Sequence, residues 1–171
     1  MNTHVSNQVP PFDNVNLYTS DPFLQSMINR WGSVDSSTEL SEFGLISGSK
    51  EMMEHARLCN ENPPKLHAFD RFGRRVNEVE YHPSYHALMA TSMAHGLHTS
   101  WWSAKSKGKL VERCAKNYMM TQTEAGHGCP ITMTFAAVPA LQTDEKLASL
   151  LVPKLLSSQY DSRNLPLSDK T

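Results

Sequence analysis

Apolar residues recur at helical spacing over most of the chain. A spacing of three or four positions places them on one face of an α-helix. Gly32, Gly48, Pro63 and Gly96 interrupt the pattern, as residues that end helices do. The pattern predicts seven helices, over residues 22–31, 36–46, 50–59, 83–95, 110–122, 131–141 and 145–152.

Four of these helices begin with residues that suit an N-cap. Asp21 precedes a proline at the first helical position, Ser49 opens the third helix, and Asp144 opens the last one. Ser36 and Glu39 have the spacing of a capping box, in which each side chain satisfies a free backbone N–H. These caps support the predicted helix starts.

Four segments depart from the amphipathic pattern. Residues 1–20 are rich in Asn and Pro and predict an extended arm that packs on the rest of the chain. Residues 66–81 predict a β-hairpin or an irregular insert, because Asp and Gly stand at turn positions between loosely alternating residues. Residues 131–141 lack a polar face and predict a helix buried on all sides. Residues 161–171 show no periodicity, so the prediction is an all-α domain over 21–160 with an arm, one insert and a linker.

Composition is that of one ordinary globular domain. The 171 residues include 16 Lys and Arg against 17 Asp and Glu, and this balance argues against a dedicated nucleic-acid-binding protein. Apolar runs are too short for a membrane span, and no signal peptide is visible, so we expect a cytoplasmic protein without a membrane partner. The three cysteines, an odd number without a CxxC pair, suit a reducing compartment and give no zinc-ribbon pattern.

Two groups of residues suggest chemistry, each beside a plainer interpretation. His82 and His86 have the i, i+4 spacing of two zinc ligands, but a third ligand is missing and both also suit a helix start. Near Trp101 and Trp102 lies a basic cluster that resembles a nucleic-acid surface, although it also suits a solvated linker. The cluster consists of Lys105, Lys107, Lys109 and Arg113.

Residues 122–135 form an unusual junction of small and hydroxyl residues ahead of the apolar helix. Such a junction leaves room for an apolar ligand between helices, although tight helix packing is the commoner reason for small residues. The chain contains no P-loop, dinucleotide fingerprint or GxSxG motif, so on its own it does not form a complete enzyme.

This junction resembles the adaptive-response acyl-CoA dehydrogenases of the AidB type. The similarity begins in the run from Glu124 to Ala137 and extends in order over nearly the whole chain. Other matching segments are Asn16–Tyr18, Asn60–Pro64, Gly73–Arg75, His82–His86 and Tyr160–Ser162.

The resemblance implies that the chain is the N-terminal helical domain of a longer flavoprotein. In this family FAD and the catalytic glutamate are held mainly by later domains, so no catalytic, cofactor or metal residue is expected here. The N-terminal helices wall the acyl pocket of an acyl-CoA-like substrate. The positions that the resemblance places in this wall are Met119, Gln122, Thr123, Gly126, Thr132 and Thr134.

The resemblance also implies partners. The arm 1–20 and the insert 66–81 match segments linked to subunit contacts, so we expect a homo-oligomer, which is a tetramer in the family. A chain separated from its flavin domain is expected to expose part of helix 131–141 and to self-associate. The alternative is a separate interaction or DNA-binding module of the alkylation-damage response.

Overall fold

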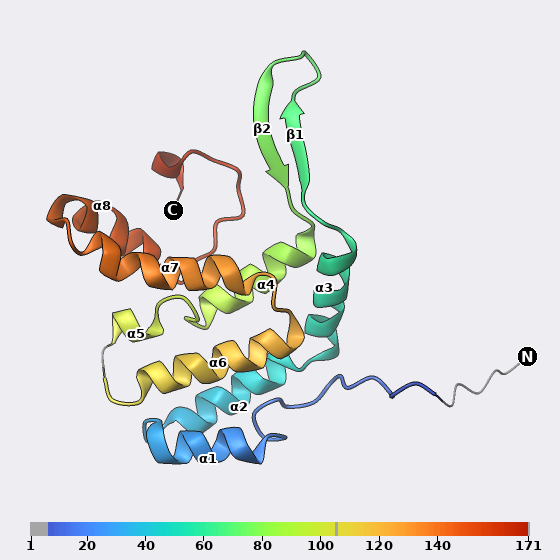
Figure 1. Ribbon diagram of the computed structural model, residues 1–171, viewed down its shortest axis with the longest axis vertical. Coiled ribbons are helices and arrows are strands. Elements are labelled where there is room, and N and C mark those ends of the chain that lie inside the picture. Colours follow the sequence, from blue (N-terminus) through green and yellow to red (C-terminus); the bar gives the residue numbers. More distant parts are fainter. Residues whose placement is uncertain (1–6, 105, 171) are drawn as a thin grey trace, which may run out of the picture.

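The computed structural model describes residues 7–104 and 106–170 and confirms the predicted all-α class (Figure 1). Each predicted helix is present in this part of the chain, together with one short additional helix, one two-stranded sheet and a 3-10 turn. The elements in chain order are α1 Pro22–Trp31, α2 Ser36–Ser47, α3 Lys50–Glu61, β1 Lys65–Phe69, β2 Arg75–Glu80, α4 Pro83–Ala94, α5 Ser100–Ser103, α6 Lys109–Thr123, α7 Gly128–Leu141, α8 Glu145–Leu155 and η1 Leu167–Asp169.

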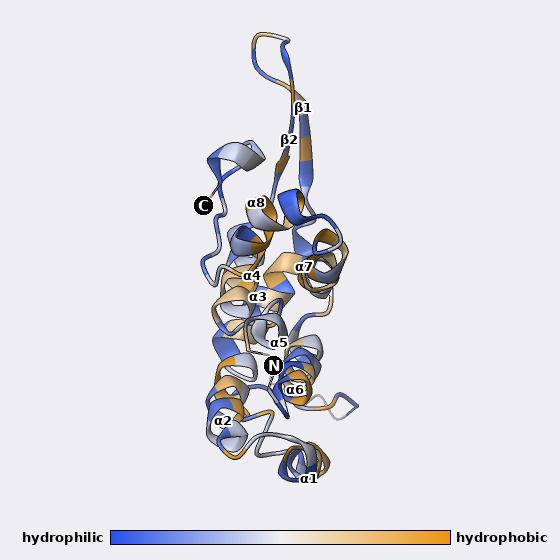
Figure 2. Ribbon diagram, turned by 90° about the vertical axis from the view of Figure 1, so that its left-hand side faces the viewer, coloured by the Kyte–Doolittle hydropathy of each residue, from blue (hydrophilic) through white to orange (hydrophobic). Residues whose placement is uncertain are grey.

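The helices pack in neighbouring pairs around one core. Helix α2 lies along α6, α3 along α4, and α7 along α8. Seen edge-on, the body is a narrow stack with α1 at one end and the hairpin projecting from the other (Figure 2). The centre of the core is made of fully buried side chains, among them Leu40, Phe43, Leu88, Leu97 and Met119. In the described part of the chain, no helix is both long and apolar enough to cross a bilayer.

Three of the predicted N-caps are confirmed, and the capping box is wrong. Asp21, Ser49 and Asp144 each accept a hydrogen bond from the backbone N–H three residues later. At α2 the N-cap residue is Asp35, which makes no side-chain capping bond. Ser36 and Glu39 instead bond to side chains of α6, because tertiary partners compete with the local cap.

The arm packs against α2, where Gly44 within the helix and Gly48 at its C-cap make the contact close. Val15 N donates to Gly48 O and Leu17 N donates to Gly44 O, each at 3.1 Å. A Cβ at Gly48 would lie 1.8 Å from Val15 O, and one at Gly44 would lie 2.3 Å from Asn16 Oδ1. Residues 15–18 therefore dock in a groove that only glycine leaves open, as the sequence predicts for an arm that packs.

The insert is the hairpin β1–β2, whose strands pair antiparallel. Asp70 orders the turn, because its Oδ1 accepts the backbone N–H groups of Phe72 and Arg74. Gly73 has φ +78°, a left-handed conformation that glycine adopts without strain. Nearly every residue of both strands is exposed, since the hairpin stands away from the helical body (Figure 1).

Helix α7 differs from the expected buried helix. Only Ile131 and Val138 are buried along it, and Met133 is 67% exposed. Burial on all sides is therefore wrong for this chain, whereas the expected exposure of part of 131–141 is confirmed. Helix α8 continues through Pro153 to Leu155, three residues beyond the predicted end at Val152.

Candidate functional site

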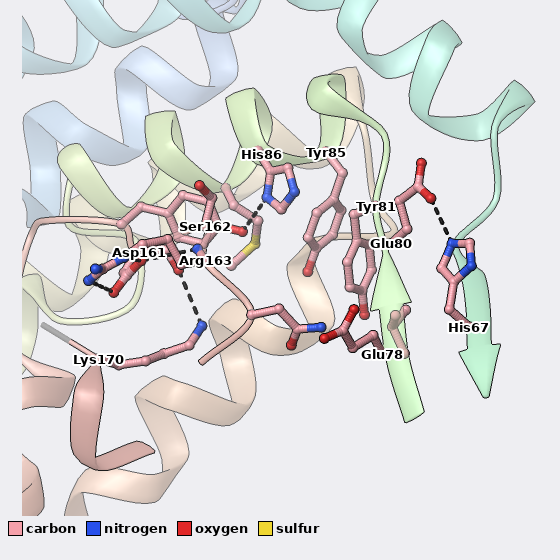
Figure 3. Close-up of a pocket in the computed structure, with 14 residues that line it drawn as sticks. His67, Glu78, Glu80, Tyr81, Tyr85, His86, Asp161, Ser162, Arg163 and Lys170 are labelled. Atoms are coloured by element: carbon pink, nitrogen blue, oxygen red, sulfur yellow. Dashed lines mark hydrogen bonds and ion pairs between the residues drawn. The ribbon is translucent and has the colours of Figure 1, made fainter. Parts of the chain in front are cut away.

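Two pockets meet where the hairpin joins the helices, and they share the side chains of Tyr81 and Tyr85. The first, which we call the hairpin-base pocket, has a volume of about 620 Å³ and lies between β2, α4 and the C-terminal tail, residues 156–170 (Figure 3). The second, which we call the Glu124 pocket, has a volume of about 490 Å³ and lies between α3, α4 and the α6–α7 junction.

Aromatic side chains form the wall of the hairpin-base pocket. The rings of Tyr81 and Tyr85 stack with centroids 4.3 Å apart. His86 Nδ1 is hydrogen-bonded to the Tyr160 hydroxyl at 2.8 Å, which fastens the tail to α4. Burial raises the pKa of Tyr160 to about 12 and lowers the pKa of His86. Both groups are therefore neutral near pH 7.

The cations of this pocket are held by the tail itself. Arg163 makes a two-point ion pair with Asp161, and Lys170 Nζ donates to the backbone carbonyl of Asp161 at 3.3 Å (Figure 3). Glu78 and Glu80 lie on the opposite, hairpin side, where Glu80 bonds to His67. Neither wall offers the uncompensated cluster of cations that a pyrophosphate requires.

The Glu124 pocket has mostly apolar walls with one buried carboxylate. Glu124 is 7% exposed and accepts three hydrogen bonds, from the backbone N–H groups of Gly126 and His127 and from His127 Nδ1. Burial opposes ionisation of this carboxyl, but these bonds outweigh it and hold the pKa of Glu124 below its usual range. Other side chains of the wall include Cys59, Pro64, Tyr81, His82, Tyr85 and Pro130.

Ser92, His127 and Glu124 form a chain of hydrogen bonds that resembles a hydrolase triad. Ser92 Oγ lies 2.8 Å from His127 Nε2, and His127 Nδ1 lies 2.7 Å from Glu124 Oε2. Ser92 is 0% exposed, so no substrate carbonyl reaches its hydroxyl. The arrangement therefore fixes the α6–α7 junction on α4 and is not a nucleophilic site.

Sequence comparison decides the family. Residues 7–162 match the adaptive response protein AidB N-terminal domain. The chain belongs to this family. It is 40% identical to Escherichia coli AidB, named as a candidate acyl-CoA dehydrogenase, over 98% of this chain. The match spans only 32% of that relative, so the chain corresponds to about a third of its length.

Solved structures with low sequence identity share the fold. The apo form of Bd2924 superposes with a TM-score of 0.81 at 23% identity and covers 90% of this chain and 32% of its own. Caenorhabditis elegans ACDH-11, crystallised with C11-CoA, gives a TM-score of 0.78 at 21% identity and covers 93% of this chain and 29% of its own. The helical domain is thus the fold of this AidB-family chain.

Of the six residues assigned to the acyl wall, Gly126 lines the Glu124 pocket. Met119 is 0% exposed and belongs to the core. Thr123 Oγ1 donates to Ser47 O, which ties α6 to α2. The structure therefore does not gather these three AidB-family positions into one cavity.

The other three positions lie on or near the surface. Gln122 and Thr132 are exposed, and Thr134 Oγ1 donates to Pro130 O within α7. The sequence analysis did not single out Tyr85 and Glu124, which line the Glu124 pocket. For Glu124 a signal was available, because His127 follows three residues later and the two side chains are hydrogen-bonded.

The described cations of the candidate nucleic-acid patch do not share one exposed surface. Arg113 is 9% exposed, donates from Nε to Leu97 O and lies over the Phe135 ring. Lys109 is ion-paired with Glu112 at 2.6 Å. Lys107 is exposed, and Lys105 lies outside the described residues. Arg113 and Lys109 are therefore engaged by other residues of the fold.

His82 and His86, the pair with zinc-ligand spacing, each bond to a different protein partner. His82 Nδ1 accepts the Ser84 N–H and caps α4, while His86 bonds to Tyr160. Among residues 7–104 and 106–170, no group of three His, Cys, Asp or Glu side chains is placed to hold a metal. The plainer interpretation of a helix start is confirmed for His82.

Proposed function

We propose that this chain forms one wall of the acyl pocket and the subunit contacts of an AidB-type acyl-CoA dehydrogenase. The observation that carries the proposal is the position of Gly126. The family resemblance assigns this residue to the acyl wall, and it lines the Glu124 pocket. The chain's place as the first third of such a flavoprotein agrees with its match to 32% of Escherichia coli AidB.

The lining of the Glu124 pocket supports an acyl group as the occupant. Pro64, Tyr85, Cys59 and Pro130 offer apolar surface, which is what an alkyl chain requires. Among the described lining residues there is no Lys or Arg to hold a phosphate. FAD therefore does not fit this pocket, and in the proposal it is bound by the rest of the polypeptide, with no step assigned to residues here.

The arm and the hairpin supply the subunit contacts in this proposal. Leu66 is 68% exposed and Phe72 is 67% exposed on the projecting hairpin, and Phe12 of the arm is 66% exposed. Large apolar side chains so exposed are common where a partner chain covers them. A homo-oligomer would bury them.

A chimera tests the pocket assignment. This chain would replace the matching third of Escherichia coli AidB, and the acyl-CoA affinity of the chimera would be compared with that of a Cys59→Phe variant. The new ring fills the pocket from the half-buried Cys59, so we expect acyl-CoA binding to weaken about tenfold or more while bound flavin is unchanged. Cys114→Phe is the matched control, because Cys114 is exposed on α6.

Two results would count against the proposal. If Cys59→Phe binds acyl-CoA as tightly as the unchanged chimera, the Glu124 pocket is not the acyl wall. If the chimera folds without flavin, the chain does not complete an AidB-type enzyme. The DNA-binding alternative is not favoured, since Arg113 and Lys109 are engaged within the fold.

A further inference from the structure

Aromatic rings form a continuous wall along one side of the hairpin-base pocket. Tyr81 and Tyr85 are stacked, with ring centroids 4.3 Å apart and 19° between the ring planes. His86 meets the edge of Tyr85, and Tyr160 lies against His86 with ring centroids 5.8 Å apart. Figure 3 shows the stacked tyrosines on one side of the cavity and the tail on the other. The volume of about 620 Å³ is enough for a ligand the size of a fused two-ring system.

The polar groups around this pocket divide into engaged ones and available ones. Both cations of the tail are engaged by Asp161, through its carboxylate and its backbone carbonyl. The side chains of Glu78, Ser162 and Asn164, by contrast, are exposed and have no hydrogen-bond partner in the described part of the chain. A ligand therefore meets a carboxylate, a hydroxyl and an amide. These groups accept and donate hydrogen bonds but supply no cation.

We propose that the hairpin-base pocket binds an uncharged planar nitrogen heterocycle of purine size, stacked on Tyr85 and hydrogen-bonded through an exocyclic amine to Glu78. Aromatic side chains stack on the faces of heterocyclic bases, and a ring amine donates to a carboxylate in a charge-assisted hydrogen bond. The Asn164 amide both donates and accepts, so it suits a ring edge that carries both kinds of group. A phosphate does not belong to this ligand, because the cations of the tail are engaged.

This inference goes beyond the proposed function and does not depend on it. Tyr81 and Tyr85 line both pockets, but the other lining residues separate them. Glu78 and Asn164 belong to the hairpin-base pocket, whereas Cys59 belongs to the Glu124 pocket. A substitution in one lining therefore tests one pocket, and either assignment stands if the other fails.

Three probes test the site on the 171-residue chain at pH 7. Adenosine supplies the ring and the amine, purine riboside supplies the ring without the amine, and ribose supplies the sugar alone. NMR would follow the methyl signal of Met89, which lines the pocket, and that of Met133, which is exposed on α7. We expect adenosine to shift the Met89 signal alone, through its ring current, and to bind about three- to tenfold tighter than purine riboside. Ribose should leave both signals unchanged.

One pair of variants tests the stacking. Tyr85→Leu removes the flat face and keeps an apolar side chain, so adenosine binding should weaken about tenfold or more. Tyr118→Leu is the matched control, because Tyr118 is an exposed tyrosine of α6 outside the pocket, and it should bind adenosine as the unchanged chain does.

A second pair of variants tests the carboxylate without replacing a buried side chain. Glu78→Ala removes the acceptor, so adenosine and purine riboside should bind with equal affinity. Glu145→Ala, at an exposed glutamate of α8, should keep the preference for adenosine. Because Glu78 is exposed on the hairpin, this test stands even where Tyr85→Leu does not fold.

Four results would overturn the inference. Adenosine could leave the Met89 signal in place, or ribose could shift it as much as adenosine does. Adenosine and purine riboside could bind the unchanged chain equally, which removes Glu78 and the amine from the contact. Finally, Cys59→Phe could abolish adenosine binding, which would place the ring in the Glu124 pocket, whereas we expect this variant to bind adenosine unchanged. None of these results bears on the flavin content of the chimera.

Discussion

At the scale of single residues, buried charges hold the helices of this domain together. Glu112 of α6 is 3% exposed and accepts hydrogen bonds from Ser33, Ser36 and Lys109. Lys116, one turn further along α6, is 3% exposed and bonds to Glu39 of α2. These contacts join α2 to α6 and fix the loop between α1 and α2.

Acid should weaken this network through Glu112. Burial alone would raise the pKa of this carboxyl, but the donated hydrogen bonds lower it to about 2. A depressed native pKa stabilises the fold above the unfolded value of about 4.3, and the contribution of about 3 kcal/mol is lost as the pH falls toward about 2. Glu112→Gln should therefore cost about 3 kcal/mol at pH 7 and about 1 kcal/mol at pH 3.

Urea unfolding at the two pH values measures this difference. Glu145→Gln is the control, because an exposed glutamate without a buried network should change the free energy of unfolding little at either pH. An equal cost of Glu112→Gln at pH 7 and pH 3 would show that the charge of Glu112 is not what stabilises the network.

At the scale of elements, the arm depends on Gly44 of α2 and on Gly48 at the C-cap of that helix. The backbone of residues 15–18 runs so close to Gly44 and Gly48 that a Cβ at either position collides with it. Leu17 and Tyr18 are buried by this contact, at 3% and 4% exposed. Helix α2 therefore binds the arm on one side and contributes to the core on the other.

Gly44→Ala should release the arm. The methyl group would lie 2.3 Å from Asn16 Oδ1 and 2.7 Å from Tyr18 N, so the arm must move, at a cost of about 1–3 kcal/mol. Thermal unfolding measures the cost, and limited proteolysis should cut residues 7–18 faster in the variant. Gly128→Ala is the control, since a Cβ there meets nothing within 4 Å. An arm equally resistant to protease in both variants would refute the close docking.

At the scale of the whole molecule, two exposed apolar regions lie on different elements. One is on α7 and α8, where Met133 is 67% exposed and Leu150 is 63% exposed. The other is the hairpin, with Leu66 and Phe72. Apolar regions of this kind promote association of a chain on its own.

The isolated chain should therefore have a solution mass above 19.2 kDa by light scattering. Replacing both Met133 and Leu150 by Gln should lower this mass if α7 and α8 form the contact, because polar side chains remove the apolar surface. The parallel change of Leu66 and Phe72 to Ser tests the hairpin. A monomer before any substitution would contradict the prediction for both regions.

The helix starts and the hairpin turn were predictable because the interactions that form them join residues close together in the sequence. Asp21, Ser49 and Asp144 cap helices through bonds that span three residues, and a helical stripe is visible in any short window of sequence. The hairpin was predictable in the same way, since Asp70 and Gly73 form the turn themselves. The resemblance over residues 124–137 identified the family.

The helices, the hairpin and the family thus follow from the sequence alone, whereas the role of each charged residue depends on the tertiary fold. Arg113 and Lys109 form a basic cluster in the sequence, yet Leu97 and Glu112 engage them in the fold. Glu124 becomes a pocket carboxylate because α3 and α4 pack beside the α6–α7 junction. Burial depends on contacts between residues far apart in the chain, and a local pattern of charge carries no information about those contacts.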